Sequence, residues 1–412
     1  MAPLDEKIIS AGEVHRSVAC PRLKMGVFAL AGAHSLATTY FFYYVYFYTR
    51  DRFGFEALQN FLLAALLGLV YAVFSFQGGR FAQRAGYFAS FRLGAGIMLA
   101  ALLAGCWMRA LWPALACIVT ANIGMCFTWP ALEALMSEGE PRARLRSLVG
   151  IYNITWAGTA AFAYFTGGAM QKSWGRQSMF LAPAGLVLAE WIFSFWLQRR
   201  VNNQPPATAE DTPPPPEPGA IRDPAPVAPA TFLKMALLAN PLAYLAINTI
   251  LPMIPILRDR LHLSLGMAGV FCSVWLFARA GAFVLLWLWP WWQYRFRFLA
   301  GAFALMIACF CAMLLARGLW VLVCSQVLLG MAFGLMYHSS LFYAMDVGQT
   351  KGEHGGIHES AIGIGNCCGP ALAALALFVF PAQPASGVLA VCLLLLCGLG
   401  VLYWMRYRKA EA

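Results

Sequence analysis

The sequence predicts an all-α integral membrane protein whose twelve transmembrane helices form two pseudo-symmetric six-helix bundles. Apolar residues make up 61% of the 412 residues and charged residues only 11%, a composition that excludes a soluble domain of this size. Twelve segments are apolar over the roughly 20 residues that a helix needs to cross a bilayer. A short charged motif also occurs twice, about half a chain apart, which indicates two related halves.

The expected spans are separated by short loops that carry most of the charge. In the first half they cover residues 25–48, 56–77, 92–109, 111–136, 147–170 and 178–198. In the second half they cover residues 235–257, 264–289, 298–316, 318–346, 356–380 and 386–405. The first span is too long for a signal-peptide core and lacks a small-residue cleavage site, so we expect it to remain attached.

The repeated motif marks equivalent loops in the two halves. Arg-Asp-Arg-Phe-Gly-Phe at 50–55 recurs 208 positions later as Arg-Asp-Arg-Leu-His-Leu at 258–263. Each copy follows one apolar segment and precedes another, as expected for an internal duplication. Tetrapeptides beginning at Gly124 and Gly334 match at an offset of 210. One register therefore covers most of each half.

The chain divides into five parts. A cytosolic N-terminal segment is expected at 1–24, a first six-helix bundle at 25–198 and a second at 232–405, followed by a cytosolic tail at 406–412. The segment between the bundles, 199–231, holds ten of the 23 prolines, a composition typical of a solvated, semi-extended linker.

Basic residues indicate the orientation in the membrane. With the N-terminus in the cytosol, 20 of the 29 Lys and Arg lie on the cytosolic side and 8 outside, and Arg279 lies within a span. We therefore expect a multi-pass protein of the cytoplasmic (inner) membrane with both termini cytosolic. The net charge of +11 indicates this topology and contact with anionic lipid headgroups, and we expect no nucleic-acid partner.

No cofactor and no metal are expected. All cysteines except Cys20 fall inside expected spans, where Cys behaves as a small packing residue, and they lack the spacing and partner ligands of a zinc site. The sequence has no Gly-x-x-x-x-Gly-Lys-Ser nucleotide-binding loop, so any transport would be driven by a gradient rather than by ATP.

The loop between the second and third spans, residues 79–87, reads Gly-Arg-Phe-Ala-Gln-Arg-Ala-Gly-Tyr. It is similar to the Gly-x-x-x-Asp-Arg-x-Gly-Arg loop of the major facilitator superfamily, with matches at Gly79, Arg84 and Gly86. Gln83 and Tyr87 depart from the pattern, which puts a charge-based latch in doubt. With the two repeated halves and the linker, the resemblance covers essentially the whole chain. It implies a monomeric secondary transporter that works by alternating access.

Arg279 is the leading candidate for a functional residue within a span, because an ionisable side chain in the membrane usually faces a pathway or a partner. It aligns with Tyr71 under the 208-residue register. The resemblance implies that spans two, five, eight and eleven line the contact between the halves. A link from Arg279 to Glu359 or to Asn153 could then break and re-form as the halves rock.

Other candidates are polar or aromatic side chains within spans. His34 and His338 could bind substrate or carry a proton, or could be satisfied by a neighbouring helix. Proton coupling is expected at Glu359, with Glu133, His358 or another histidine as alternatives. Further substrate-site candidates are Thr38, Tyr40, Tyr44, Asn153, Trp156 and Asn248.

These residues favour a transporter of a small organic solute, sugar-like, zwitterionic or a carboxylate, coupled to protons. A drug or metabolite exporter of the same fold is the first alternative, although the Arg-x-x-x-Gly and Gly-x-x-x-Gly-Pro signatures of antiporters are missing from spans four and five. A sensor or scaffold that does not transport is the second, because fold does not determine function. An intramembrane enzyme is disfavoured, since no His-Glu-x-x-His or serine-based motif is present.

Overall fold

The computed structural model describes residues 21–138, 142–203, 227–347 and 352–408, and all regular structure in them is helical. The first half contains α1 (Pro21–Phe53), α2 (Ala57–Ala85), α3 (Tyr87–Trp107), α4 (Leu111–Ser137), α5 (Arg142–Trp174) and α6 (Ser178–Asn202). The second contains α7 (Pro229–Arg260), α8 (Leu265–Cys272), α9 (Val274–Leu288), α10 (Phe296–Leu314), α11 (Leu319–Val347), α12 (Gly352–Val379) and α13 (Ser386–Tyr407).

Each of the twelve expected spans coincides with a helix of the described chain, except that the eighth is divided into α8 and α9 at Ser273. Eleven spans are long and apolar enough to cross a membrane, with α8 and α9 counted together. The remaining span, α5, is of comparable length but carries more polar residues, including Asn153. The prolines of the expected linker lie mostly outside the described residues, and α1 begins at Pro21, inside the segment expected to precede it.

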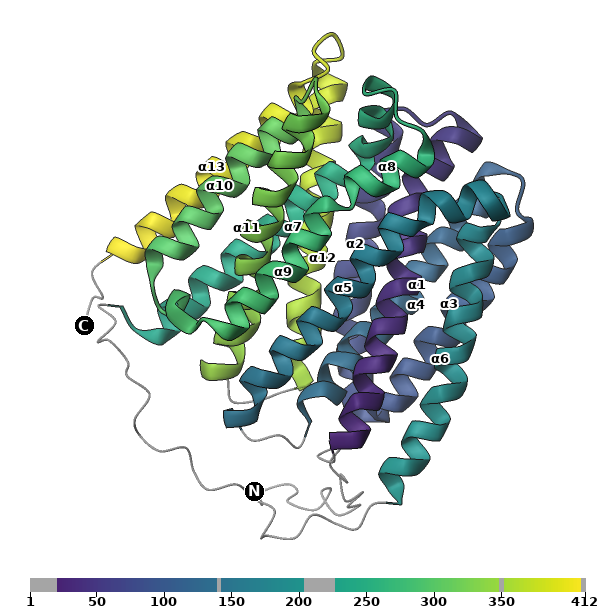
Figure 1. Ribbon diagram of the computed structural model, residues 1–412, viewed down its shortest axis with the longest axis vertical. Coiled ribbons are helices and arrows are strands. Elements are labelled where there is room, and N and C mark those ends of the chain that lie inside the picture. Colours follow the sequence, from purple (N-terminus) through teal and green to yellow (C-terminus); the bar gives the residue numbers. More distant parts are fainter. Residues whose placement is uncertain (1–20, 139–141, 204–226, 348–351, 409–412) are drawn as a thin grey trace, which may run out of the picture.

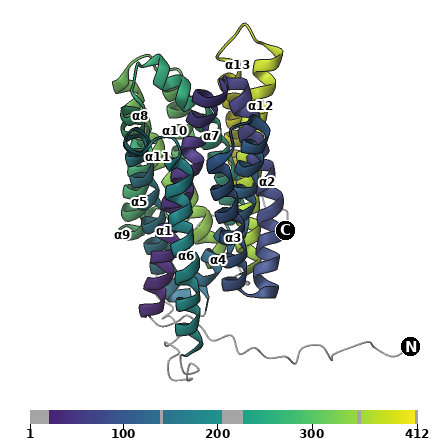
Figure 2. The same cartoon turned by 90° about the vertical axis from the view of Figure 1, so that its right-hand side faces the viewer.

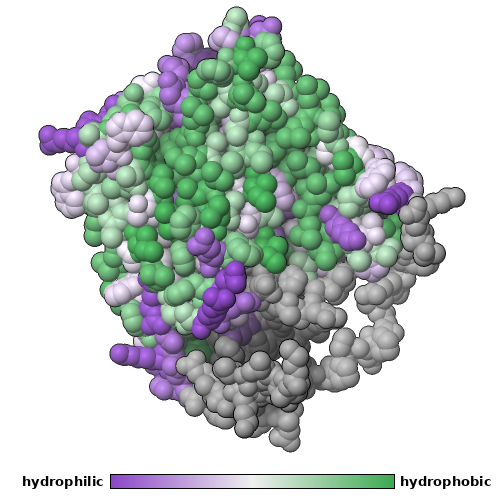
Figure 3. Space-filling model, turned by 180° about the vertical axis from the view of Figure 1, so that it is seen from behind, coloured by the Kyte–Doolittle hydropathy of each residue, from purple (hydrophilic) through white to green (hydrophobic). Residues whose placement is uncertain are grey.

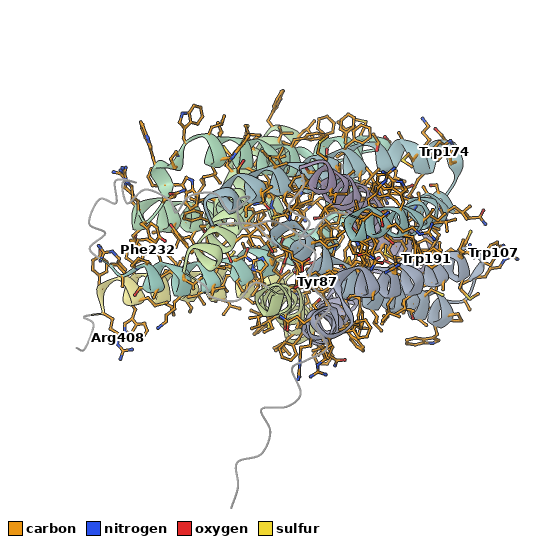
Figure 4. All side chains as sticks on the ribbon, turned by 90° about the horizontal axis from the view of Figure 1, so that it is seen from below. Tyr87, Trp107, Trp174, Trp191, Phe232 and Arg408 are labelled. Atoms are coloured by element: carbon orange, nitrogen blue, oxygen red, sulfur yellow. The ribbon has the colours of Figure 1, made fainter. Side chains whose placement is uncertain are left out.

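The halves stand side by side in Figure 1. Both views show that they consist of long helices running in roughly one direction (Figures 1 and 2). Seen from below, Phe232 and Arg408 of the second half lie at one end of the molecule, and Trp107, Trp174 and Trp191 of the first lie at the other (Figure 4). Much of the face seen in Figure 3 is apolar. Large apolar side chains such as Leu66, Val73 and Leu393 are exposed on the surface of the molecule. This surface suits lipid as the solvent.

Small residues bring α2 against α12 along much of their length. A Cβ atom added at Gly68 would lie 2.3 Å from the backbone of Asn366, and one added at Gly363 would lie 2.3 Å from the nitrogen of Ala72. Nearer the face where α1 begins, one added at Gly79 would lie 2.6 Å from the Cα of Gly356. We call the contact of α2 with α12 at Gly68, Gly79, Gly356 and Gly363 the glycine seam. Close backbone approach of this kind is typical of membrane helices.

The two copies of the repeated motif contact each other at the opposite face, which we call the far face. The Nη2 atom of Arg50 lies 2.9 Å from Oδ2 of Asp259, and the Nη2 atom of Arg258 lies 3.2 Å from Oδ1 of Asp51. We call these four residues the charge clamp. Each half supplies one arginine and one aspartate, so the two bridges between the halves are reciprocal.

Candidate functional site

A cavity of about 180 Å³ lies between the halves. Its wall is formed by α1, α2, α4 and α5 of the first half and by α7, α11 and α12 of the second. Most lining side chains are apolar or aromatic. The polar, non-aromatic ones are Ser35, Thr38, Thr39, Asn122, Asn248, Glu359 and Asn366. The arrangement suits a small solute held by a few polar groups in a largely apolar chamber.

Glu359 belongs to a buried carboxyl cluster at the cavity wall. Tyr71 Oη donates a hydrogen bond to its Oε2 atom at 2.5 Å. Glu133, His358 and Glu359 each have a side-chain oxygen or nitrogen atom of the kind that can ligate a metal, and these three atoms all lie within 4.8 Å of one another. One oxygen of Glu133 and Nε2 of His358 are buried without a partner among the described atoms. Two close, buried carboxylates repel each other when both are charged, so the geometry favours a pair that holds at least one proton.

The cluster joins the two halves of the protein. Glu133 lies on α4 and Tyr71 on α2 of the first half, whereas Glu359 and His358 lie on α12 of the second. The proximity of α2 and α12 follows from the glycine seam. Its contacts at Gly68 and Gly363 lie toward the far face from Glu359, and its contact between Gly79 and Gly356 lies toward the face where α1 begins. The carboxyl pair therefore lies in the contact between the halves.

The guanidinium of Arg279 lies in a cage of aromatic rings. Its Cζ atom is 4.6 Å from the ring centroid of Trp156, 5.0 Å from that of Tyr337 and 5.6 Å from those of Tyr244 and Phe283. Nη2 donates to the Tyr244 hydroxyl at 3.2 Å, and Nε is buried without a partner in the described structure. The electron-rich ring faces attract the cation.

The link expected from Arg279 to Glu359 or Asn153 is not formed in this conformation. Among the described residues, no carboxylate lies within 4.0 Å of the Arg279 guanidinium. The Asn153 side chain instead accepts a hydrogen bond from Trp156 Nε1 at 3.1 Å and lies 3.3 Å from Nδ1 of His338.

Four of the substrate-site candidates lie in the cavity wall: Thr38, Trp156, Asn248 and Glu359. Asn248 Nδ2 donates to Oδ1 of Asn366 at 2.5 Å, which pairs α7 with α12 at the wall. The Thr38 hydroxyl donates to the backbone carbonyl of His34 within its own helix. Asn248 and Thr38 retain donor or acceptor capacity that a solute could use.

The other candidates are buried in the bundles, outside the cavity wall as described. His34 Nδ1 lies 2.8 Å from Glu190, and its Nε2 lies 2.7 Å from the Thr128 hydroxyl, so α6 and α4 satisfy both ring nitrogens. His338 packs against Trp292 with ring centroids 5.4 Å apart. The Tyr40 hydroxyl is hydrogen-bonded to that of Ser178, and the Tyr44 hydroxyl donates a hydrogen bond to the backbone carbonyl of Tyr164.

The motif expected in the loop between spans two and three lies mostly within α2, because this helix continues to Ala85 and only Gly86 separates it from α3. Gly79 contributes to the glycine seam, and Gly86 has a φ of 89°, a conformation that residues with a side chain rarely adopt. Arg84 is exposed at the end of α2.

Residues that the sequence analysis missed include Tyr71, Tyr244, Tyr337 and Asn366. Tyr71 carried a signal, because it aligns with Arg279 in the repeat. Asn366 stands in the glycine-rich run 365–370, a pattern that is equally typical of close helix packing. Tyr337 ends the tetrapeptide that matches residues 124–127 in the repeat, whereas Tyr244 had no signal that set it apart from other aromatic residues.

The fold and the central cavity define a multi-pass membrane transporter built from two duplicated halves. The family model of the Major Facilitator Superfamily matches residues 28–370, and the chain belongs to this family. It is therefore a transporter and not an enzyme. No curated protein sequence matches the chain.

Proposed function

We propose that the protein is a proton-coupled secondary active transporter of a small organic solute in the cytoplasmic membrane, with both termini in the cytosol. The observation that carries the proposal is the cavity between the halves, with the carboxyl pair of Glu133 and Glu359 at its wall. A solute in this cavity touches both halves and can influence how they move.

Coupling follows from the position of the carboxyl pair. With one or two protons, Glu133 and Glu359 attract each other by hydrogen bonding across the interface. With none, two buried negative charges from opposite halves repel each other. Proton loss thus weakens the contact between α4 and α12, and proton gain strengthens it. Glu359 lines the cavity, so the proton and the solute share one chamber.

Alternating access is supported by contacts on both sides of the cavity. The charge clamp closes the far face, which we assign to the outside, and the glycine seam closes the interface toward the face where α1 begins. The clamp can separate into water because its side chains are partly exposed, 41% for Asp259. Rocking of the halves would open one side while the other remains closed.

The test is uptake into proteoliposomes driven by an imposed pH gradient, with a panel of radiolabelled organic acids, amino acids and sugars. Glu133→Gln and Glu359→Gln should each reduce gradient-driven uptake by about a hundredfold, because a neutral amide cannot release a proton. Exchange of solute without a gradient should be less affected. A chelator should not change uptake, since a proton rather than a metal cation is the coupling ion.

Glu190→Gln is the matched control, because Glu190 is equally buried but is bonded to His34 inside the first half. Its uptake should remain within about threefold of that of the unmodified protein. Equal uptake with and without the pH gradient would contradict proton coupling. Solute binding without any flux would instead favour a sensor.

A further inference from the structure

We infer that the transported solute is a small monocarboxylate with an apolar body, and that Arg279 binds its carboxylate. The inference rests on the proposed function, because it names the substrate class of the same cavity. Three observations carry it: a buried cation that has no anionic partner among the described residues, its position behind the cavity wall and the chemistry of the lining.

The first observation is the charge of Arg279. Its side chain is 2% exposed, and no carboxylate of the described chain lies within 4.0 Å of it. Ring faces and one phenol hydroxyl are its partners, and Nε has none among the described atoms. A buried guanidinium normally has an anionic partner that accepts two parallel hydrogen bonds. The missing anion is the solute carboxylate.

The second observation is the place of the cage. Three of its rings, those of Trp156, Tyr244 and Tyr337, also line the cavity. The guanidinium therefore lies directly behind the wall. The Tyr244 hydroxyl, 3.2 Å from Nη2, occupies a position where a carboxylate oxygen could accept a hydrogen bond. A carboxylate that displaces this hydroxyl reaches Arg279 without entering a second chamber.

The third observation concerns the part of the solute other than its carboxylate. No lysine, arginine or histidine is among the residues that line the cavity, so among the described residues the single positive charge of Arg279, behind the wall, is the one placed to balance an anion. A phosphate, with its second negative charge, would remain uncompensated. The wall is otherwise rich in aromatic and aliphatic side chains, including Phe42, Met125 and Leu251. These favour a hydrocarbon body over a polyhydroxylated one.

Binding to the purified full-length protein tests this inference without requiring transport. Benzoate and butyrate are compared with benzamide and butyramide, which have nearly the same shape but no charge. We expect the two acids to raise the melting temperature and the two amides to leave it unchanged. Arg279→Gln should weaken acid binding by about tenfold or more, because a charge-assisted bidentate contact is lost.

Tyr244→Phe provides a variant that keeps the ring and removes only the competing hydroxyl. It should bind the acids more tightly than the unmodified protein, by a few fold. This gain tests the inference even where the Arg279→Gln variant does not fold. Equal binding of acids and amides, or acid binding that is unchanged in Arg279→Gln, would overturn the inference. So would the absence of an Arg279-dependent shift with either acid.

The two proposals fail in different ways. Arg279-dependent acid binding without gradient-driven uptake would leave the inference intact and remove the proposed function. Gradient-driven uptake of a neutral solute that persists in Arg279→Gln would leave the function intact and remove the inference.

Discussion

The two halves meet in two unlike contacts, the charge clamp at the far face and the glycine seam between α2 and α12. The clamp is made of long charged side chains whose tips meet at about 3 Å in partly exposed positions. The seam is made of backbone that approaches too closely to admit a Cβ atom. The clamp can therefore be separated by water and salt, whereas the seam can separate only if two helices move apart as rigid bodies.

This difference assigns separate roles to the two contacts. Partly exposed ion pairs contribute about 0.2–1 kcal/mol each and are weakened by salt, which suits a contact that opens in every cycle. A packed seam is sensitive to a single methyl group, which suits a contact that must close to one geometry. The carboxyl pair lies beside the seam, so under the proposed coupling a proton would act on the more exacting of the two contacts.

The largest effect should come from filling the seam. Gly68→Leu would place a side chain against the backbone of Asn366 and force α2 away from α12. We expect the free energy of unfolding to fall by about 1–3 kcal/mol. We also expect the binding of acids in the cavity to be lost. Thermal unfolding and ligand-induced shifts measure both. Gly96→Leu on α3 is the control, since nothing lies within 4 Å of an added Cβ there; equal damage in both variants would argue against the seam.

A smaller effect should follow from breaking the clamp. Asp259→Arg would replace the bridge to Arg50 with repulsion and favour opening of the far face. We expect a severalfold change in the initial rate of uptake, and partial recovery when Arg50→Asp is added, because the second variant restores an opposite-charge pair. The difference between Asp259→Arg and the unmodified protein should shrink in high salt. A double variant no better than the single one would show that these charges do not pair in the membrane.

The smallest effect should come from the turn position at which the two copies of the repeated motif have different residues. Gly54 has a φ of 70° and His262, at the equivalent position, has a φ of 52°. Gly54→Ala should cost about 1 kcal/mol in the free energy of unfolding, because a side chain disfavours this conformation. His262→Gly should cost nothing or stabilise slightly. If both substitutions lowered the melting temperature equally, the cost of a side chain at positive φ would not apply to both copies of the motif.

Span positions could be predicted from sequence because a run of apolar residues long enough to cross a bilayer is rare outside membrane helices. The division of span eight could not, because Ser273 carries no proline or glycine signal. The repeat predicted which loops are equivalent. It did not predict that the loops contact each other, since that depends on how the halves dock.

The candidate site was harder to predict because partners lie on distant parts of the chain. His34 is ambiguous from sequence because Glu190, the residue that satisfies it, lies 156 positions away. Arg279 was expected to meet a carboxylate or an amide, and it meets aromatic rings instead. In a chain with 14% aromatic residues, no pattern distinguishes the rings that surround a cation from those that only pack.

The reciprocal form of the clamp has a consequence for the origin of the chain. Each motif supplies an arginine to the other half and receives an arginine from it, so the contact has the self-complementary character of a two-fold symmetric dimer. Two identical six-helix subunits would form the same pair of bridges without any change of sequence. The centre has diverged, since Tyr71 and Arg279 occupy equivalent positions, whereas the contact between the motifs keeps its two-fold form.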